Sequence, residues 1–168
     1  NGQCYFLNLV KKEASVYSNN SKQSDIFIPR SIKFKNTNYI ITSVHKDAFS
    51  QNKYIKTITF SHDSEIKLIE HHSFNESTIQ SIVFPLQVTT IGESSFTCCF
   101  DLKRVEFLQN SKIKTIEKFA FSVTGIETLI IPSSVETLKE GWINQCNLTN
   151  IVLLPSPTQN IIYYNNQF

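Results

Sequence analysis

One pattern of apolar and polar positions recurs along most of the chain. It is clearest from Val88 to Phe107, which reads V-x-x-I-G-x-x-S-F-x-x-C-x-x-L-x-x-V-x-F. Its second apolar residue and its aromatic residue each recur in steps that are alternately longer and shorter. A nearly fixed period of about 22–25 residues is the signature of a repeat architecture. The two series are Val44, Ile69, Ile91, Ile116 and Leu138, and Phe49, Phe74, Phe96, Phe121 and, replacing Phe, Ile143.

A short run with strand character follows each motif, and its first, fourth and sixth residues are apolar in every copy. We expect these runs to stack as a parallel sheet, about 4.8 Å per repeat, because one repeat alone cannot bury its apolar side. The Phe column then forms an aromatic spine in the core. Each short segment around a Phe is expected to form one helical or 3-10 turn. The five runs cover residues 55–60, 79–84, 102–107, 126–131 and 148–153.

Loop lengths add a second level of order. Loops of five and three residues alternate between the end of one run and the next motif. Pro85 and Pro132 directly follow the runs that precede the short loops. Proline has no N–H for a sheet ladder and ends the strand there. We therefore expect the effective unit to be a pair of repeats, one long and one short.

The remaining segments predict a cap and a flank within one domain of 168 residues. The cap is expected to hold strands in 4–10 and 13–17, and a hairpin in 31–44 that turns at Asn36-Thr37-Asn38. Such a cap shields the open end of a solenoid from water. The predicted divisions are an N-terminal β cap at 1–40, repeats at 41–154, about five in number and about 22–25 residues each, and a C-terminal flank at 155–168. The flank could instead be the start of another repeat.

The repeat motif resembles the BspA-type (Treponema pallidum-type) leucine-rich repeat, with its consensus I-x-x-I-G-x-x-A-F-x-x-C-x-x-L-x-x-I-x-I-P. The resemblance covers roughly Ala14 to Leu154. It implies an α/β, β-rich leucine-rich repeat solenoid with a parallel concave sheet, short helical or 3-10 turns and a β-hairpin-rich N-terminal cap. Gly92 alone keeps the consensus glycine, so that turn need not require positive φ. The other copies have His45, Glu70, Glu117 and Lys139 there.

The composition of the chain favours neither nucleic acid nor a membrane as its partner. The formal net charge is +2, with acidic and basic residues intermixed, so nothing favours binding to nucleic acid. No apolar run approaches the ~20 residues of a membrane-spanning helix, and no membrane insertion is expected within this segment. The chain has no Met, even at position 1, and is expected to be a piece of a longer protein.

No cluster of residues predicts catalysis, and we expect no enzyme, no cofactor and no metal. His71 and His72 are adjacent, and neighbours on an extended segment point to opposite sides, which does not suit a shared metal ion. The triplet His62-Asp63-Ser64 has the residue types of a catalytic triad, but contiguous residues rarely give its geometry. Neither a Gly-rich phosphate loop nor an H-E-x-x-H motif is present.

The four cysteines are expected to be free. Cys99 and Cys146 occupy the same motif position two repeats apart. This places them about 10 Å apart on strand spacing, whereas a disulfide needs Cα atoms within about 7 Å. Their column is small and polar, so both thiols should be buried beside backbone groups. Cys98 is expected to point outward.

The third and fifth residues of each strand run should project from the concave face. They are short of charge and partly apolar, which fits a protein-binding patch with Arg104 at its centre. An ordinary solvated β surface also favours these residue types, so both interpretations stay open. The rows are Thr57, Thr59, Ser81, Val83, Arg104, Glu106, Thr128, Ile130, Asn150 and Val152.

The resemblance implies a cell-surface or secreted protein that acts in adhesion or host–microbe interaction. Its ligand would be an extracellular-matrix, host or microbial surface protein. A composition rich in Asn, Ile, Lys and Ser points to a protist parasite. The alternative is a cytoplasmic scaffold or cytoskeleton-associated interaction protein, with which free thiols are compatible. Open sheet edges at the two ends of the solenoid could support end-to-end self-association.

Three N-x-[ST] sequons begin at Asn19, Asn75 and Asn147. Asn19 lies in a polar loop and is the expected glycosylation site if the chain is secreted by a eukaryote. Asn147 follows the position predicted for a buried thiol and is expected to be less accessible.

Overall fold

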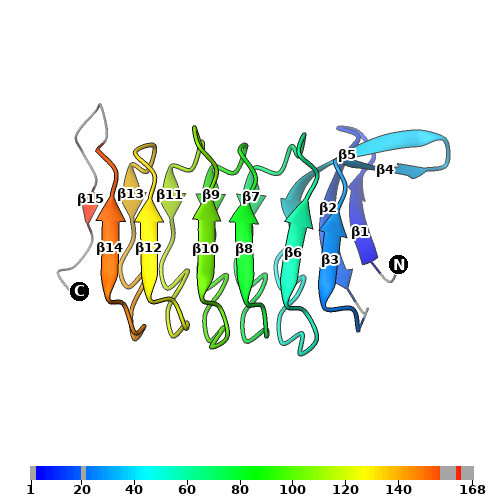
Figure 1. The fold of residues 1–168 in the computed structure, drawn as a ribbon. Coiled ribbons are helices and arrows are strands. Elements are labelled where there is room, and N and C mark those ends of the chain that lie inside the picture. Colours follow the sequence, from blue (N-terminus) through cyan, green and yellow to red (C-terminus); the bar gives the residue numbers. More distant parts are fainter. Residues whose placement is uncertain (1–2, 20–21, 156–161, 164–168) are drawn as a thin grey trace.

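The computed structural model describes residues 3–19, 22–155 and 162–163. The chain winds as a solenoid, with the N-terminal hairpins at one end and β14 (Asn150–Leu153) and β15 (Ile162–Tyr163) at the other (Figure 1). Successive coils stack along one axis, which confirms the predicted solenoid of parallel strands. We call the surface outside the longer strands, β3 to β14 in Figure 1, the strand face.

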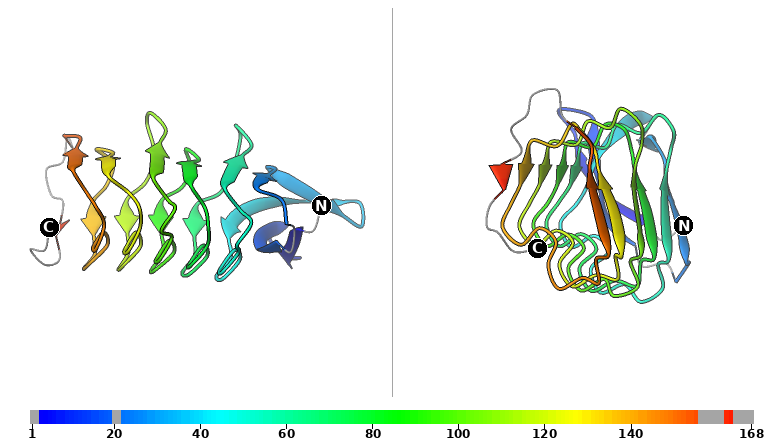
Figure 2. Two further views of the ribbon diagram at one scale, coloured as in Figure 1. Left: turned by 60° about the horizontal axis from the view of Figure 1, so that its bottom comes forward. Right: turned by 60° about the vertical axis from the view of Figure 1, so that its left-hand side comes forward.

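The coils carry two parallel sheets where the sequence predicted one. What we call the first sheet lies under the strand face and has two hydrogen-bonded parts. One part comprises β3 (Asp25–Ile28), β6 (Thr57–Phe60), β8 (Ser81–Phe84) and β10 (Arg104–Phe107), and the other is the separate pair of β12 (Thr128–Ile131) and β14. The second arises because the last two residues of each I-x-x-I motif also pair between coils. The right-hand view of Figure 2 shows the two sheets on different sides of the coil.

The second sheet has nine strands and joins the cap to the repeats. Its order is β1-β2-β5-β7-β9-β11-β13-β15, with β4 paired to β5. Its members besides β15 are β1 (Gln3–Asn8), β2 (Glu13–Asn19), β4 (Ser31–Phe34), β5 (Thr37–Val44), β7 (Leu68–Ile69), β9 (Thr90–Ile91), β11 (Thr115–Ile116) and β13 (Thr137–Leu138).

Complete and weakened strand pairing alternate in the first sheet, and the weakened pairing coincides with the strands that end at Pro85 and Pro132. All four residues pair between β3 and β6, between β8 and β10, and between β12 and β14. Only two residue pairs join β6 to β8, and β10 and β12 do not pair. After β14, Leu154 N donates to Ile131 O at 3.0 Å. Pro85 and Pro132 have no N–H at the equivalent point after β8 and β12, so the ladder to the preceding strand is weakened there.

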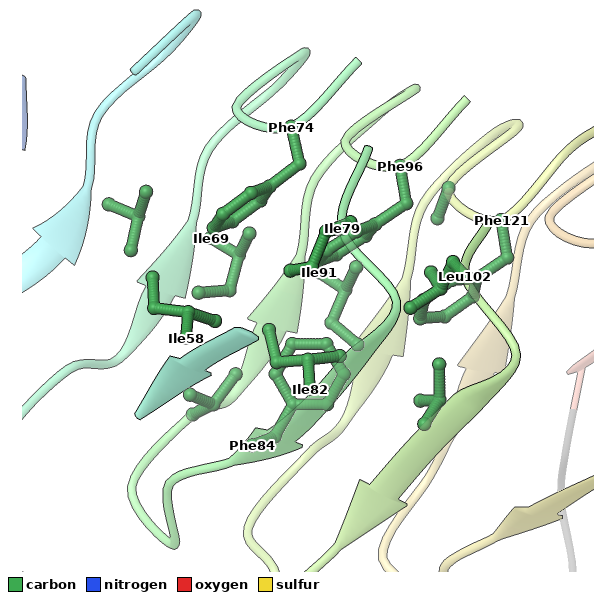
Figure 3. Close-up of a cluster of buried hydrophobic side chains, with 14 of the residues drawn as sticks. Ile58, Ile69, Phe74, Ile79, Ile82, Phe84, Ile91, Phe96, Leu102 and Phe121 are labelled. Atoms are coloured by element: carbon green, nitrogen blue, oxygen red, sulfur yellow. The ribbon is translucent and has the colours of Figure 1, made fainter. Parts of the chain in front are cut away.

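The predicted aromatic spine is confirmed. Phe49, Phe74, Phe96 and Phe121 are each 1% exposed or less. Neighbouring rings stack nearly parallel, with centroids 5.0, 4.9 and 5.3 Å apart along the column. Figure 3 shows three of these rings side by side above the isoleucines of the two sheets. The spacing is close to that of hydrogen-bonded strands, about 4.8 Å, so each of these four coils adds one ring to the stack.

The predicted helical or 3-10 turns are absent from the described residues, where the same segments are non-helical turns. Around Phe96, both Ser94 and Cys98 have left-handed φ, at 52° and 59°. Thr97 N donates locally to Ser94 O, but Phe96 N donates to Ala120 O of the next coil at 2.8 Å. Because alternate N–H groups are used between coils, no continuous local ladder can form. The prediction was wrong since it considered each repeat alone.

Gly92 lies where the main chains of two coils approach each other closely. Its φ is not unusual, as expected from the other copies of the motif, which have no glycine there. Its φ lies outside the left-handed region, and a Cβ added there would lie 2.7 Å from Ile69 O and 2.8 Å from the Glu70 carbonyl carbon. Gly92 N donates to that same Ile69 oxygen at 2.8 Å. The main chains of two coils therefore meet here without room for a side chain.

Both expected hairpins are present in the N-terminal cap. β1 and β2 pair antiparallel, as do β4 and β5. The second hairpin turns at Lys35 and Asn36, slightly earlier than predicted, and both have positive φ, at 44° and 62°. Two consecutive residues with φ > 0 are typical of a type I′ turn, whose twist matches the flanking strands. β3 lies within the predicted cap but pairs in parallel with β6, so the first sheet begins earlier than the sequence indicated.

The C-terminal flank continues the repeat register. β15 pairs in parallel with β13, with Tyr163 opposite Leu138. Tyr163 is the next member of the series that ends with Leu138, at the longer of the two alternating steps. Residues 156–161 and 164–168 of the flank lie outside the described residues.

Replacing Phe96 by Ala should lower the free energy of unfolding by about 3–5 kcal/mol, because a fully buried ring is removed from a stack that relaxes only partly. Denaturant unfolding followed by circular dichroism measures the change. Val83→Ala, at an exposed strand position, is the control and should stay within about 0.5 kcal/mol of the parent. An unchanged midpoint for Phe96→Ala would show that this ring does not hold the coils together.

Replacing Gly92 by Ala should cost about 1–3 kcal/mol, because the added methyl group meets the main chain of the neighbouring coil. Glu117→Ala is the matched control, since the same motif position already accommodates a Cβ in that coil. The two variants are compared by their unfolding midpoints at equal slope. Equal stability would show that the coils separate there without cost.

Candidate functional site

The strand face presents the first and third residues of each four-residue strand to solvent. On β12, for example, Thr128 and Ile130 are exposed and Leu129 and Ile131 are buried. The same alternation holds for β8, where Val83 is exposed and Ile82 and Phe84 are buried. This is the ordinary consequence of a two-residue period in a strand whose other face meets the core. All ten residues predicted for the rows lie at these outward positions: Thr57, Thr59, Ser81, Val83, Arg104, Glu106, Thr128, Ile130, Asn150 and Val152.

Strand pairing aligns these residues in two rows within each hydrogen-bonded group of strands. Arg104 lies opposite Ser81 and Glu106 lies opposite Val83. In the same way, Thr128 lies opposite Asn150, and Ile130 lies opposite Val152. Figure 1 shows the corresponding strands side by side along the solenoid. The arrangement of the predicted surface is therefore set by the register of the parallel ladder.

The rows begin one strand earlier than the sequence analysis placed them. Asp25 pairs with Thr57 and Phe27 with Thr59, so β3 adds two residues to the strand face. Phe27 is 57% exposed. The signal was in the sequence, because Asp25-Ile26-Phe27-Ile28-Pro29 has the same outward–inward alternation and the same terminal proline as 81–85 and 128–132. It was missed since β3 lies far from the next strand run.

Charged side chains on the strand face are hydrogen-bonded to neighbouring side chains. Arg104 Nε donates to Glu106 Oε1 at 2.6 Å, and this hydrogen bond raises the pKa of the Arg104 guanidinium. Hydrogen bonds from Ser24 and from Thr57 lower the pKa of the Asp25 carboxyl. These side chains are exposed, and such pairs contribute little to stability.

A groove of about 600 Å³ opens where the ladder fails between β10 and β12. Both strands contribute side chains to it, together with the loops at 108–111 and 132–134. Ser134 Oγ is buried there and has no hydrogen-bond partner among the described residues. The residues on its rim include Arg104, Glu106, Leu108, Thr128, Ile130 and Leu154. Sequence reasoning did not predict this groove, because it assumed that every pair of neighbouring strands is hydrogen-bonded.

The cysteine positions agree in part with the predictions. All four thiols are free. Cys99 is buried and donates to Phe74 O at 3.0 Å, and burial raises its pKa to about 11. Cys146 is only half-buried, although it donates to Phe121 O at 3.1 Å. It lies in the last coil whose motif turn is described, so no further motif turn among the described residues covers it. Cys98 is also partly exposed.

The histidine motifs form no shared site in the described part of the chain. His71 and His72 are both exposed, and His72 lies 4.0 Å from Asp47. In the triplet at 62–64, Ser64 is buried and its Oγ accepts a hydrogen bond from Ile66 N. No group of three His, Cys, Asp or Glu side chains that could hold a metal ion occurs among the described residues.

The expected glycosylation site can be placed only in part. Asn19 is the last residue of β2, but its side chain and the rest of its sequon, residues 20–21, lie outside what the structure describes. Asn147 is exposed, so the expectation that it would be less accessible was wrong. The reason is that the neighbouring Cys146 is itself only half-buried.

Comparison with known proteins identifies related sequences and folds. A family model described as BspA type leucine rich repeat region matches residues 42–166 in six copies. The structure of the pneumococcal vaccine antigen PcpA is similar, with a TM-score of 0.72 and 22% identity over 92% of this chain and 49% of its own. The chain thus spans about half the length of that protein. No curated protein sequence matches the chain.

Two further solved structures have the same fold. The leucine-rich repeat protein of T. pallidum has a TM-score of 0.63 and 22% identity, over 92% of this chain and 80% of its own. A leucine-rich repeat protein from Bacteroides capillosus has a TM-score of 0.59 and 19% identity, over 91% and 94%. At these sequence identities the similarity shows a shared fold alone.

Thiol labelling in mildly alkaline buffer should separate the cysteines. Cys4 and Cys98 should react quickly with a disulfide reagent in the folded protein, because both reach solvent. Cys99 should react only on unfolding, since its pKa of about 11 keeps it protonated and burial blocks the reagent. Cys99→Ser is the control and should remove only the labelling that requires unfolding. Equal fast labelling of all four thiols would contradict the structure.

Proposed function

Because the chain belongs to the BspA-type leucine-rich repeat family, we propose that it is a non-enzymatic protein-binding module whose binding surface is the strand face. The ten predicted row residues, together with Asp25 and Phe27, would form this surface. Solenoids commonly use such extended faces to bind other proteins, because each coil adds a row of side chains to one continuous surface.

One observation carries the proposal, namely the apolar patch beside the groove between β10 and β12. Ile130 is 57% exposed, and Val152, directly opposite it on β14, is 39% exposed. Leu108 and Leu154 extend the patch to the loops, with exposed fractions of 47% and 42%. Contiguous exposed apolar groups around a pocket are typical of binding hot spots. The adjacent Arg104–Glu106 pair would supply orientation and specificity.

We place this module at the cell surface or in a secreted protein, acting in adhesion or host–microbe interaction. Support comes from the family and from the fold shared with PcpA, which is described as a vaccine antigen. The partner would be a matrix, host or microbial surface protein, and the sequon at Asn19 would carry a glycan. Origin in a protist parasite and end-to-end self-association belong to the same proposal. Among the described residues, no helix is long and apolar enough to cross a membrane.

A second candidate is an intracellular scaffold or cytoskeleton-associated protein. The observation in its favour is the set of four free thiols, of which Cys4 is exposed and Cys98 partly exposed. Exposed free thiols persist more readily in a reducing compartment. Labelling of intact source cells with a membrane-impermeant reagent separates the two candidates. Labelling of the chain before lysis supports the surface function, and protection until lysis supports the scaffold.

Substitution on the strand face should weaken partner binding without unfolding the chain. Arg104→Glu combined with Ile130→Asp should reduce binding to matrix proteins or host cells by about fivefold to thirtyfold, which corresponds to a loss of about 1–2 kcal/mol of binding free energy. Binding is measured as the concentration dependence of adhesion of purified protein to these surfaces.

The matched control is Lys118→Glu, which changes an exposed charge away from the strand rows. It should bind like the parent. Loss of binding in Lys118→Glu, with full binding by the strand-face variant, would show that the opposite side of the solenoid is used. Unfolding midpoints of both variants exclude an effect of lost stability.

A further inference from the structure

Two hairpin turns lie at the same end of the second sheet. β2 and β5 run parallel, with Glu13 opposite Ile40. The turn at 9–12 precedes β2 and the turn at 35–36 precedes β5. Turns that precede parallel, neighbouring strands must lie at the same edge of a sheet. Figure 1 shows the β4–β5 hairpin projecting beyond the body of the solenoid at the N-terminal end.

Large apolar side chains point into solvent at both turns. Val10 is 93% exposed, the highest value among the described large apolar residues, and Leu9 is 67% exposed. Phe34, beside the second turn, is 45% exposed. None of the three belongs to the core or to the strand face. Leu9 also lines a pocket with Phe6 and Leu7. Val10 and Phe34 protrude from their turns, so a partner must accommodate a projection.

Lysines surround these apolar groups. Lys11 and Lys12 follow Val10, and Lys33 and Lys35 flank Phe34. All four are exposed, and no ion pair involves them in the described part of the chain. Lys35 Nζ lies 5.5 Å from the centre of the Phe34 ring. Glu13 is the one acidic residue in the two hairpins, 3–19 and 31–44.

The distribution of charge along the chain also makes the N-terminal end basic. Residues 1–44 carry six Lys or Arg and two Asp or Glu, whereas residues 45–168 carry ten and twelve. The overall charge of +2 therefore conceals a basic N-terminal end and a slightly acidic remainder. An anionic surface would orient the molecule with the hairpin turns toward it.

The turns hold their apolar side chains in place. Asn8 Oδ1 accepts hydrogen bonds from Val10 N at 3.2 Å and from Lys11 N at 3.0 Å. The second turn is a two-residue turn with left-handed φ at Lys35 and Asn36. Both projections are therefore presented by hydrogen-bonded hairpins, and little conformational entropy is lost when they are buried.

We propose that the two turns form a docking site for an anionic phospholipid bilayer. Leu9, Val10 and Phe34 enter the boundary between headgroups and acyl chains, and the four lysines bind the lipid phosphates. This combination of apolar insertion and basic residues is what reversible attachment to a membrane surface requires. The contact is peripheral. A search for long apolar runs cannot detect it, because it depends on three side chains from two turns, which is why the sequence predicted no membrane insertion.

Sedimentation with vesicles tests the electrostatic part. The purified protein should bind vesicles of phosphatidylcholine that contain a minor share of anionic phosphatidylglycerol, and binding should fall with added salt. Replacing Lys11, Lys12, Lys33 and Lys35 by Gln should reduce the partition coefficient by about tenfold or more, since each lysine near an anionic surface contributes to attraction. The matched control replaces Lys67, Lys103, Lys112 and Lys118 by Gln and should bind like the parent.

A single tryptophan tests the apolar part. Val10→Trp should show a blue-shifted emission on anionic vesicles and quenching by brominated lipids. Val83→Trp, on the strand face, should show neither effect, and the buried Trp142 gives the same background in both. Leu9→Asn with Val10→Asn should lower vesicle binding, whereas Ile130→Asn with Val152→Asn should not.

Three results would overturn the proposal. The first is equal binding by the parent and the four-lysine variant. The second is an unshifted Val10→Trp spectrum on vesicles that bind the protein, which would indicate attraction to any polyanion, such as an acidic protein, without insertion. The third is absence of vesicle binding by the parent at low salt. The outcome is independent of the strand-face proposal, because the substitutions lie on a different surface.

Discussion

The hydrogen bonds between successive coils are the constraint on which the rest of the structure depends. Phe96 N donates to Ala120 O and Gly92 N donates to Ile69 O, both at 2.8 Å. Parallel strands joined in this way lie about 4.8 Å apart, and stacked phenylalanine rings fill the same interval. Residues at the same motif position in successive coils therefore stack in a column and have similar surroundings. The spine, the polar Cys99 column and the outward rows all follow from this single translation.

The groove on the strand face is a consequence of where that translation is interrupted. Pro132 cannot donate to the preceding strand, and β10 and β12 do not pair. The coils remain stacked, because the second sheet continues from β9 through β11 to β13 and the Phe spine runs beneath. A solenoid can thus lose one ladder on one face without losing its core, and the opening lies among exposed apolar residues.

The molecule has two surfaces of different character. The strand face is nearly neutral and built from paired strands, whereas the N-terminal turns are basic and protrude. The family accounts for the first, since repeated outward rows are a property of the solenoid. The second depends on the cap, which lies largely outside the region matched by the family model at residues 42–166.

The sequence by itself determined the repeat, the spine and the outward rows, because period and alternation are local properties of the chain. The alternating long and short steps located every phenylalanine of the spine, and alternation in 81–84 and 128–131 located the row residues. Only the tertiary structure decided how backbone groups are shared between coils. That sharing replaced the expected helical turns with left-handed residues at Ser94 and Cys98, created the second sheet, and left β10 and β12 unpaired. It also brought the turns before β2 and β5 to one edge, since parallel pairing of distant segments cannot be read from either segment alone.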